Sequence, residues 1–513
     1  MELEDIPLRK TCIFLLAALL LIVSLPIFAE GSQPRLIPML GYEAADNDRQ
    51  WQDNLFFQRM AQRTDLQFSF SQFADLAAYE TYLKGLRKDD VDLPAVLYKA
   101  RLDYVTAMAL YEEGVLVDLA PYLKEYAPNF FAMMQQNPEI ERAITLQDGA
   151  VVALPFISRL PGQNILWINK AWLEELKIPM PRTIEELEQA LTAFKNGDPN
   201  RNGRNDEIPL SFIGPYDLKY LSHAWGLIAN DFNISVDGGT VEFMPLEARF
   251  TNFLTWCRDM YAAGNLDRDG FTTADTLRRQ TDAKAVNRYG AFFGPLPTTV
   301  VPMEWTSQYQ AMLPLSYEGK TVYRAVASRV FFGTFALTAA CDDIPGMLSW
   351  VDYLYTQEGA VLAGIGLEGE DFVRDGDGSW RLLRETGDRT YFSQVIIATD
   401  QSAPGISTED FQRYYTDPIV RSLTEQTELV AQVSSLPFPD LPLTSDEVEK
   451  IAPLQSSIAR YVDESIARFV LGEWQITDGQ LEEFQNELEA LGLNEFLAFW
   501  QYVYDRGMRG NGL

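Results

Sequence analysis

The sequence predicts an α/β fold with a largely parallel sheet, from its length, its apolar content and its alternating patterns. The chain has 513 residues, 47% of them hydrophobic, which is enough for two or three domains or one large bilobal domain. Apolar and polar residues alternate at residues 66–70, as in a strand, whereas residues 51–63 repeat at helical spacing. Strands that alternate with helices indicate βαβ units.

The first elements also suggest where a ligand binds. We expect a first strand at residues 35–40, a second helix at 79–87 and a short apolar strand at 94–98. Ligands of α/β sheets bind beyond the carboxyl ends of the strands. The loops after the two strands, residues 41–45 and 99–104, are therefore expected to line a ligand site.

Later segments continue the same alternation. Residues 107–123 are predicted to be helical, residues 150–155 form a strand after an Asp-Gly turn, and residues 165–170 form a strand that leads into a helix. Thr183-Ile-Glu-Glu predicts a capping box, in which the threonine and the second glutamate satisfy the first N–H groups of a helix. Its apolar residues recur at helical spacing: Ile184, Leu187, Leu191 and Phe194.

That helix leads into a loop with the ligand spacing of an EF-hand. Oxygen-bearing side chains occupy positions one, three, five and nine of the loop, and Gly203 occupies position six, where the chain must turn. Position twelve is Pro209 instead of glutamate, so the remaining carboxylate must come from beside position nine. The alternative is a solvated Asx turn without a cation. We predict a structural calcium site with these ligands: Asp198, Asn200, Asn202, the backbone carbonyl of Arg204, Asp206 and Glu207.

The N-terminus and the charge balance indicate export and exclude some partners. Arg9 and Lys10 precede an apolar run at residues 12–28, so we expect residues 1–29 to be a cleaved signal peptide, or else an uncleaved membrane anchor. Cys12 lies at the start of the run, whereas a lipid-attachment cysteine follows such a run, so Cys12 cannot be one. A net charge of −31 argues against nucleic acid and against anionic lipid headgroups as partners.

Few residues suggest catalysis. The one histidine, His223, has no nucleophile elbow around it, and a packed helix residue is the simpler interpretation. No Cys or His spacing resembles a zinc site, and no phosphate-cradling glycine loop is present. Cys257 and Cys341 are far apart in sequence, and the sequence leaves open whether they pair. We therefore expect that the protein is not an enzyme.

The segment Trp167-Ile-Asn-Lys-Ala-Trp-Leu, the capped helix and the Asp198 loop together resemble the family 1 extracellular solute-binding proteins, in particular the calcium-containing alginate-oligosaccharide-binding group. Many members of that group are lipoproteins, whereas this chain has no cysteine directly after its apolar run. The resemblance covers nearly the whole mature chain and rests on the Asp198 loop and these segments: Trp167-Ile-Asn-Lys-Ala-Trp-Leu, Tyr111-Glu-Glu-Gly-Val-Leu-Val-Asp-Leu, Asp148-Gly-Ala-Val-Val-Ala-Leu-Pro-Phe, Gly290-Ala-Phe-Phe-Gly-Pro, Tyr355-Thr-Gln-Glu-Gly and Gly366-Leu-Glu-Gly-Glu-Asp-Phe.

The resemblance implies a bilobal, periplasmic-binding-protein-like type II fold: two α/β lobes with a hinge, and C-terminal helices. It implies lobe I at residues 33–155 plus 295–385 and lobe II at 156–294 plus 400–513, with residues 290–294 suited to a crossing between them. It also implies an importer's membrane permease and ATPase as partners, and we expect a monomer.

Candidate ligand residues come from the predicted loops. A sugar cleft needs aromatic platforms beside charged and amide groups. Tyr42 and Arg101 follow predicted strands of lobe I, and a plain surface role is the alternative for both. Arg159 could clamp the carboxylate of an acidic sugar or be solvated, and Trp225 and Trp305 could belong to the core.

We therefore expect an exported, non-catalytic substrate-binding component of an ATP-driven importer, with an oligosaccharide as its ligand. Two alternatives remain: a ligand-sensing co-receptor for a membrane signalling protein, and a calcium-stabilised extracellular hydrolase. The calcium loop is expected to stiffen lobe II and to have no direct role in binding the ligand.

Overall fold

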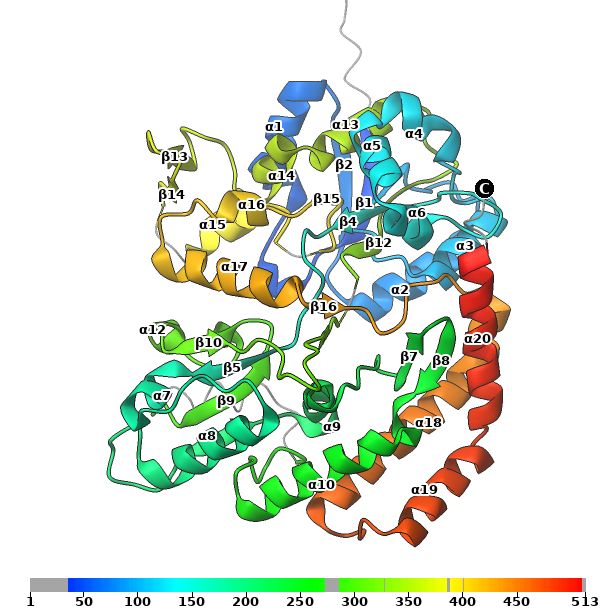
Figure 1. The fold of residues 1–513 in the computed structure, drawn as a ribbon. Coiled ribbons are helices and arrows are strands. Elements are labelled where there is room, and N and C mark those ends of the chain that lie inside the picture. The colour runs from blue at the N-terminus through cyan, green and yellow to red at the C-terminus, as the bar shows by residue number, and fades with distance from the viewer. Residues whose placement is uncertain (1–35, 273–285, 327, 385–387, 400, 510–513) are drawn as a thin grey trace, which may run out of the picture.

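The structure is a computed structural model, and its described residues form two α/β lobes, one above the other in Figure 1. The predicted leader, residues 1–29, lies outside the described residues. Within them, no helix combines the length and apolarity that a bilayer span requires. The described ranges are 36–272, 286–326, 328–384, 388–399 and 401–509.

Lobe I, the upper lobe, is built on a six-stranded sheet in the order β15–β4–β12–β3–β1–β2. β12 runs antiparallel to both of its neighbours, and the other pairs are parallel. The strands are β1 (Ile37–Tyr42), β2 (Phe68–Phe73), β3 (Val96–Tyr98), β4 (Leu154–Ile157), β12 (Val330–Leu337) and β15 (Gly405–Ile406).

The helices of lobe I begin at polar caps. The side chains of Asn54, Asp75 and Asp103 accept backbone N–H groups at the starts of the first three helices, as N-cap residues do. A hairpin of β13 (Phe372–Arg374) and β14 (Trp380–Leu382) lies at the side of the lobe. The helices are α1 (Leu55–Thr64), α2 (Leu76–Gly85), α3 (Tyr104–Glu112), α4 (Ala120–Tyr126), α5 (Pro128–Gln136), α6 (Pro138–Ile144), α13 (Ile344–Asp352), α14 (Gln357–Gly364), α15 (Arg389–Gln394) and α16 (Glu409–Gln412).

Lobe II, the lower lobe, has a four-stranded sheet in the order β10–β5–β9–β6 and one core that includes the C-terminal helices. Its strands are β5 (Ile165–Asn169), β6 (Ile208–Ser211), β9 (Tyr289–Gly294) and β10 (Tyr309–Ala311), with a hairpin of β7 (Ile234–Asp237) and β8 (Thr240–Phe243). Its helices are α7 (Lys170–Leu176), α8 (Ile184–Gly197), α9 (Gly214–Lys219), α10 (Ala248–Ala263), α12 (Met303–Thr306), α18 (Ser445–Leu471), α19 (Asp478–Ala490) and α20 (Leu493–Arg509).

Three segments connect the lobes. Residues 158–164 lead from β4 to β5, residues 325–326 and 328–329 lie between β11 (Tyr323–Arg324) and β12, and α17 (Pro418–Ala431) leads to β16 (Ser434–Ser435) and then to α18. The segments are joined by backbone hydrogen bonds: Ser158 N–H to Arg329 O at 2.7 Å, Val326 N–H to Gly162 O at 2.8 Å and Ala325 N–H to Ser435 O at 2.9 Å. They therefore form one connected hinge region.

The α/β bilobal fold is confirmed, and the structure corrects several details. The sheets are mixed, because β12 enters lobe I from the hinge and β5 runs opposite to β9. Residues 290–294 do not cross between the lobes but lie inside the lobe II sheet as part of β9. β10 also lies in lobe II and β15 in lobe I, although the predicted boundaries place them in the other lobe. The exact extent of each lobe stays a prediction.

The predicted capping box is half present. Thr183 accepts the N–H of Glu186 at 3.3 Å, but the Glu186 carboxylate accepts the N–H of Arg182, not that of Thr183. The apolar residues of α8 are buried as their spacing predicts.

Candidate ligand-binding cleft

The edge of the lobe I sheet that faces lobe II carries the expected loops. β1, β3, β4 and β15 all end at this edge, and β12 begins there because it runs antiparallel to them. In lobe II, Ile165 of β5 directly follows the hinge and pairs with Gly294 of β9. The carboxyl ends of β9 and β6 therefore face lobe I, which is the arrangement in which α/β folds bind ligands.

Tyr42 and Arg101, two of the predicted ligand residues, lie together at this edge. The guanidinium carbon of Arg101 is 5.4 Å from the centroid of the Tyr42 ring, and that ring stacks on Tyr79 with centroids 6.1 Å apart. This geometry is a cation–π contact. Arg101 is exposed, so its N–H groups stay accessible from the cleft.

The backbone around Arg101 is strained and clamped. Lys99 and Arg101 both have left-handed backbone conformations, with φ of 49° and 48°. Ala100 and Leu102 donate their N–H groups to Thr334 O and Gly333 O, both at 3.0 Å. Such strain at non-glycine residues is characteristic of functional sites. The strained segment holds the Arg101 side chain toward the cleft.

A buried cluster of charged side chains contacts this segment through Lys99. The sequence patterns did not identify this cluster. The carboxylate of Glu43 contacts Lys99 Nζ at 2.9 Å, Arg49 Nη1 at 2.6 Å and Trp51 Nε1 at 3.0 Å. The Glu43 and Lys99 side chains are almost fully buried. Glu43 lies in the predicted loop 41–45, but neither its burial nor its partners were visible in sequence.

Two adjoining cavities form a groove along the same edge, and both are lined by Gln401. One, of about 400 Å³, is lined by Glu80, Arg101, Leu102, Asp103, Phe331, Phe332, Thr334, Gln401 and Ser402. The other, of about 410 Å³, is lined by Phe156, Ser158, Leu296, Ala360, Gly364, Ala398, Thr399, Gln401, Ile406, Ser407, Thr408, Glu409 and Gln412. Leu296 comes from lobe II, so the second cavity is lined by both lobes.

Phe156, Phe331 and Phe332 line the groove, and further aromatic residues lie close to it. Phe332 stacks on Tyr104 with ring centroids 4.3 Å apart, and Phe331 packs beside Phe156 at 6.1 Å. Tyr216 is exposed on α9, directly after the cleft-facing end of β6, and the cation of Arg324 lies 6.0 Å from its ring centroid. None of these residues was selected from the sequence, because only the fold brings them to the cleft.

Arg159 lies in the hinge, where the protein's own acids hold it. Its guanidinium pairs with Glu428 of α17 and lies 3.4 Å from Asp410. Arg413 shares the Glu428 carboxylate at 2.5 Å. These ion pairs join the first connecting segment to α17, and a role for Arg159 in ligand binding stays a prediction.

The two predicted tryptophans line neither cavity of the groove. Trp225 is 8% exposed and packs edge-on against Phe253 and Trp256, with ring centroids 5.8 and 6.0 Å away. Trp305 is half-buried and packs against the lobe II core. In this structure both tryptophans make core contacts, which is the alternative role that the sequence left open for them.

The predicted calcium residues lie in one loop at the opposite edge of the lobe II sheet. The loop runs from Asp198, which ends α8, to the start of β6, and so lies away from the cleft. Asp198 accepts the N–H groups of Asn202 and Gly203, both at 3.0 Å, and Asp206 accepts Asn202 Nδ2 at 2.9 Å. Asn200 lies 3.4 Å from Asp206, and Arg204 donates its N–H to Asn202.

Glu207 fits a cation site. Both of its carboxylate oxygens are buried without a hydrogen-bond partner, a costly arrangement for a carboxylate that nothing neutralises. Burial, with the neighbouring Asp206 and Asp198, raises the pKa of Glu207. Nowhere in the described ranges do three or more His, Cys, Asp or Glu side chains form a metal cluster. Asparagine and backbone oxygens would have to complete the donor set in this loop.

His223 is a packed residue. Its Nε2 accepts the N–H of Leu315 at 2.9 Å, so Nδ1 carries the proton and donates to Tyr220 O. Burial lowers the pKa of His223 to about 4, which keeps the ring neutral near pH 7. Cys257 and Cys341 are unpaired and pack with the cores of different lobes.

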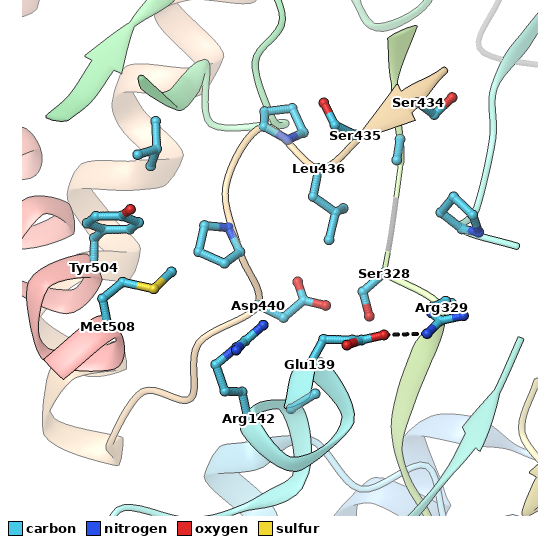
Figure 2. Close-up of a pocket in the computed structure, with 16 residues that line it drawn as sticks. Glu139, Arg142, Ser328, Arg329, Ser434, Ser435, Leu436, Asp440, Tyr504 and Met508 are labelled. Carbon is cyan, nitrogen blue, oxygen red and sulfur yellow. Dashed lines mark hydrogen bonds and ion pairs between the residues drawn. The ribbon is translucent and has the colours of Figure 1, made fainter. Parts of the chain in front are cut away.

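A further cavity, of about 460 Å³, lies at the hinge and shares no lining residue with the groove. All three connecting segments contribute to it, through Pro161, Ser328 and residues 434–440. Figure 2 shows Tyr504 and Met508 of α20 on one side and the ion pair of Glu139 with Arg329 on the other. Because it lies among the connections and not at the strand ends, we do not take it as the ligand site.

The chain is similar to known substrate-binding proteins along most of its length. No family model matches it. It is 25% identical over 482 residues, 88% of this chain and 87% of the relative, to the fructooligosaccharide ABC transporter substrate-binding protein FusA of Streptococcus pneumoniae serotype 4. It is 22% identical, over 80% of this chain and 81% of the relative, to the polygalacturonan/rhamnogalacturonan-binding protein YtcQ of Bacillus subtilis.

Solved structures show the same fold. An extracellular solute-binding protein from Bifidobacterium longum subsp. infantis aligns over 92% of this chain and 98% of its own, with a TM-score of 0.77 and 19% identity. An EF-hand mutant of the S. pneumoniae protein FusA, in complex with fructo-nystose, covers 93% and 100%, with a TM-score of 0.71 and 21% identity. The alginate-binding protein AlgQ2 without calcium ion covers 92% and 98%, with a TM-score of 0.65 and 20% identity. The resemblance to extracellular solute-binding proteins is confirmed.

Proposed function

We propose that this protein is the extracellular substrate-binding component of an ABC importer and that it binds an oligosaccharide between its lobes. The groove at the strand ends carries the proposal, because it combines an accessible arginine, aromatic rings and a wall from lobe II. The relatives named for fructooligosaccharide and polygalacturonan binding support the same class of ligand.

Binding would proceed by closure of the lobes. Leu296 of lobe II already lines the cavity that Ser407 and Gln412 of lobe I also line, so a ligand there contacts both lobes. A ligand that touches both walls binds the closed form more tightly than the open form and shifts the population toward it. Arg101 would donate hydrogen bonds to sugar hydroxyls, and Phe331 and Phe332 would pack on the apolar faces of the rings.

The partners follow from this role. A membrane permease and its ATPase would receive the ligand from the closed protein, which would act as an exported, non-catalytic monomer. His223, the one histidine, is neutral and engaged at both ring nitrogens inside lobe II, which favours a role in packing over catalysis.

A structural calcium ion would occupy the loop from Asp198 to Glu207. The ion would neutralise the buried Glu207 carboxylate and tie the end of α8 to the start of β6. Two similar structures, the EF-hand mutant of FusA and the alginate-binding protein AlgQ2 without calcium ion, support this assignment.

Titration calorimetry tests the ligand class directly. Oligosaccharides, including uronates, and short peptides would be titrated into the wild type, and we expect binding for an oligosaccharide and none for the peptides. Leu296→Asp, at the groove, should lose that binding, whereas Leu313→Asp, exposed elsewhere in lobe II, should keep it. Binding of peptides alone, or of no oligosaccharide, would refute the proposal.

A further inference from the structure

The charges along the groove distinguish between neutral and acidic oligosaccharides. We infer that the ligand is a neutral oligosaccharide and that a ligand with a carboxylate on each sugar is excluded. This inference rests on the proposed function and specifies its substrate class.

Most cations at the cleft-facing edge of lobe I are already bound to the protein's own acids. Lys99 and Arg49 share the buried carboxylate of Glu43. Arg159 and Arg413 share Glu428. These side chains cannot turn to a ligand without leaving a buried or half-buried carboxylate uncompensated, which is strongly unfavourable.

Among the described residues that line the two cavities, Arg101 is the one cation. Within the described ranges no carboxylate pairs with its guanidinium, which lies over the ring of Tyr42. Two acids, Glu80 and Asp103, line the same cavity, and Asp103 also caps the start of α3. Near this arginine, the acidic side chains outnumber the cation.

The second cavity supplies no further cation within the described ranges. Glu409 is the charged residue that lines the second cavity, and it accepts hydrogen bonds from Ser158 Oγ, at 3.1 Å, and from Ser407 Oγ. On lobe II, Arg324 lies buried beside the rings of Tyr216 and Tyr220 and pairs with Asp231.

An acidic oligosaccharide carries one carboxylate on each sugar and needs a cationic partner for each carboxylate that the closed cleft removes from water. Among the described residues that line the two cavities, one accessible arginine beside Glu80, Asp103 and Glu409 cannot supply these partners. Sugar hydroxyls, in contrast, both donate and accept, and therefore suit a wall of arginine, carboxylates, serines and glutamine.

Calorimetry with matched ligands tests the inference. A panel of fructo-, gluco-, galacto- and manno-oligosaccharides first identifies the neutral oligosaccharide that binds most tightly. That ligand is then compared with a uronate oligosaccharide of the same length. The pair of galactotriose and trigalacturonate is measured in every case. We expect affinity at least tenfold weaker for the acidic partner of each pair. The affinity for the neutral ligand should change less than twofold between low and high salt, since no charge pair is formed.

A charge variant separates groove electrostatics from overall charge. Glu80→Lys should strengthen binding of the acidic ligand, whereas Glu473→Lys, an equal charge change at an exposed site after α18, should not. Equal or tighter wild-type binding of the acidic ligand, or equal effects of the two variants, would overturn the inference and leave the proposed oligosaccharide function standing. If neither neutral nor acidic oligosaccharides bind, the proposed function fails and the inference fails with it.

Discussion

The carbonyl oxygen of Gly333 accepts the backbone N–H of Leu102 at 3.0 Å, and this bond ties the strained segment around Arg101 to the start of β12. Gly333 has φ of 75°, and a Cβ at this position would overlap the carbonyl oxygen of Leu102. The close approach requires glycine. The position of Arg101 in the cleft therefore depends on a residue more than two hundred positions away in sequence.

Gly333→Ala should destabilise the protein by about 2–4 kcal/mol, because it adds a steric overlap to the roughly 1 kcal/mol of a left-handed alanine. Gly378→Ala is the matched control. Gly378 has φ of 86° but open space where a Cβ would lie, so alanine there costs only the energy of the left-handed backbone conformation. Denaturant unfolding measures both free energies, and equal losses would contradict the overlap.

Arg101→Met should weaken ligand binding by about tenfold to a hundredfold, because hydrogen bonds from a charged donor contribute roughly 1.5–3 kcal/mol. Methionine retains an apolar side chain over Tyr42. Arg87→Gln removes a cation from the exposed surface of the same lobe, where it pairs with Glu113, and should leave the affinity unchanged. Calorimetry would compare the two variants. An unchanged ligand affinity in Arg101→Met would show that this arginine does not bind the ligand.

Calcium removal should lower stability and spare binding. A chelator should lower the melting temperature by about 2–4 °C for each 1 kcal/mol of lost stabilisation, while the ligand affinity of the folded protein stays nearly constant. The loop and the cleft lie at opposite edges of the lobe II sheet, which is why the two effects separate. Asp206→Ala should have the same effect as the chelator and abolish any further response to it. Loss of binding without unfolding would contradict this account.

His223 should make stability depend on pH in a predictable direction. Burial lowers its pKa in the folded protein from 6.5 to about 4, so the unfolded chain takes up a proton first as the pH falls. The stabilisation is complete above pH 6.5 and is lost as the pH falls from 6.5 toward 4. At about 1.4 kcal/mol for each pKa unit, the loss is at most roughly 3.5 kcal/mol.

His223→Gln provides the control for this titration. Glutamine cannot be protonated in this range, and its amide can still donate and accept a hydrogen bond. Because His223 is the one histidine of the chain, the variant should lose the histidine's share of the pH dependence between pH 6.5 and 4, while the share of the carboxyl groups stays. Denaturant unfolding at several pH values measures it, and identical pH profiles for wild type and variant would show that the histidine is not responsible.

Local sequence patterns predicted the parts of the site that local physics determines. Tyr42 and Arg101 follow strands whose apolar patterns are legible, and the sheet brings these residues to one edge. The Asp198 loop was visible because its oxygens are spaced within a few residues. Patterns of this kind need no knowledge of the tertiary fold.

The remaining site residues depend on distant segments. Phe332 and Leu296 reach the groove through the hinge and through strand order, which no local pattern encodes. Trp225 was a candidate because of its chemistry, yet α10 covers it. Glu43 was passed over within the correct loop, because its partner Lys99 lies 56 residues away.

Small-angle X-ray scattering with and without a neutral oligosaccharide tests whether the lobes close around a ligand. We expect a ligand that binds in calorimetry to reduce the radius of gyration, because the Leu296 wall of lobe II closes on the Arg101 wall of lobe I. Leu296→Asp should remove both the binding and the compaction. Saturating ligand without any change in the radius of gyration would contradict closure of the lobes around an oligosaccharide.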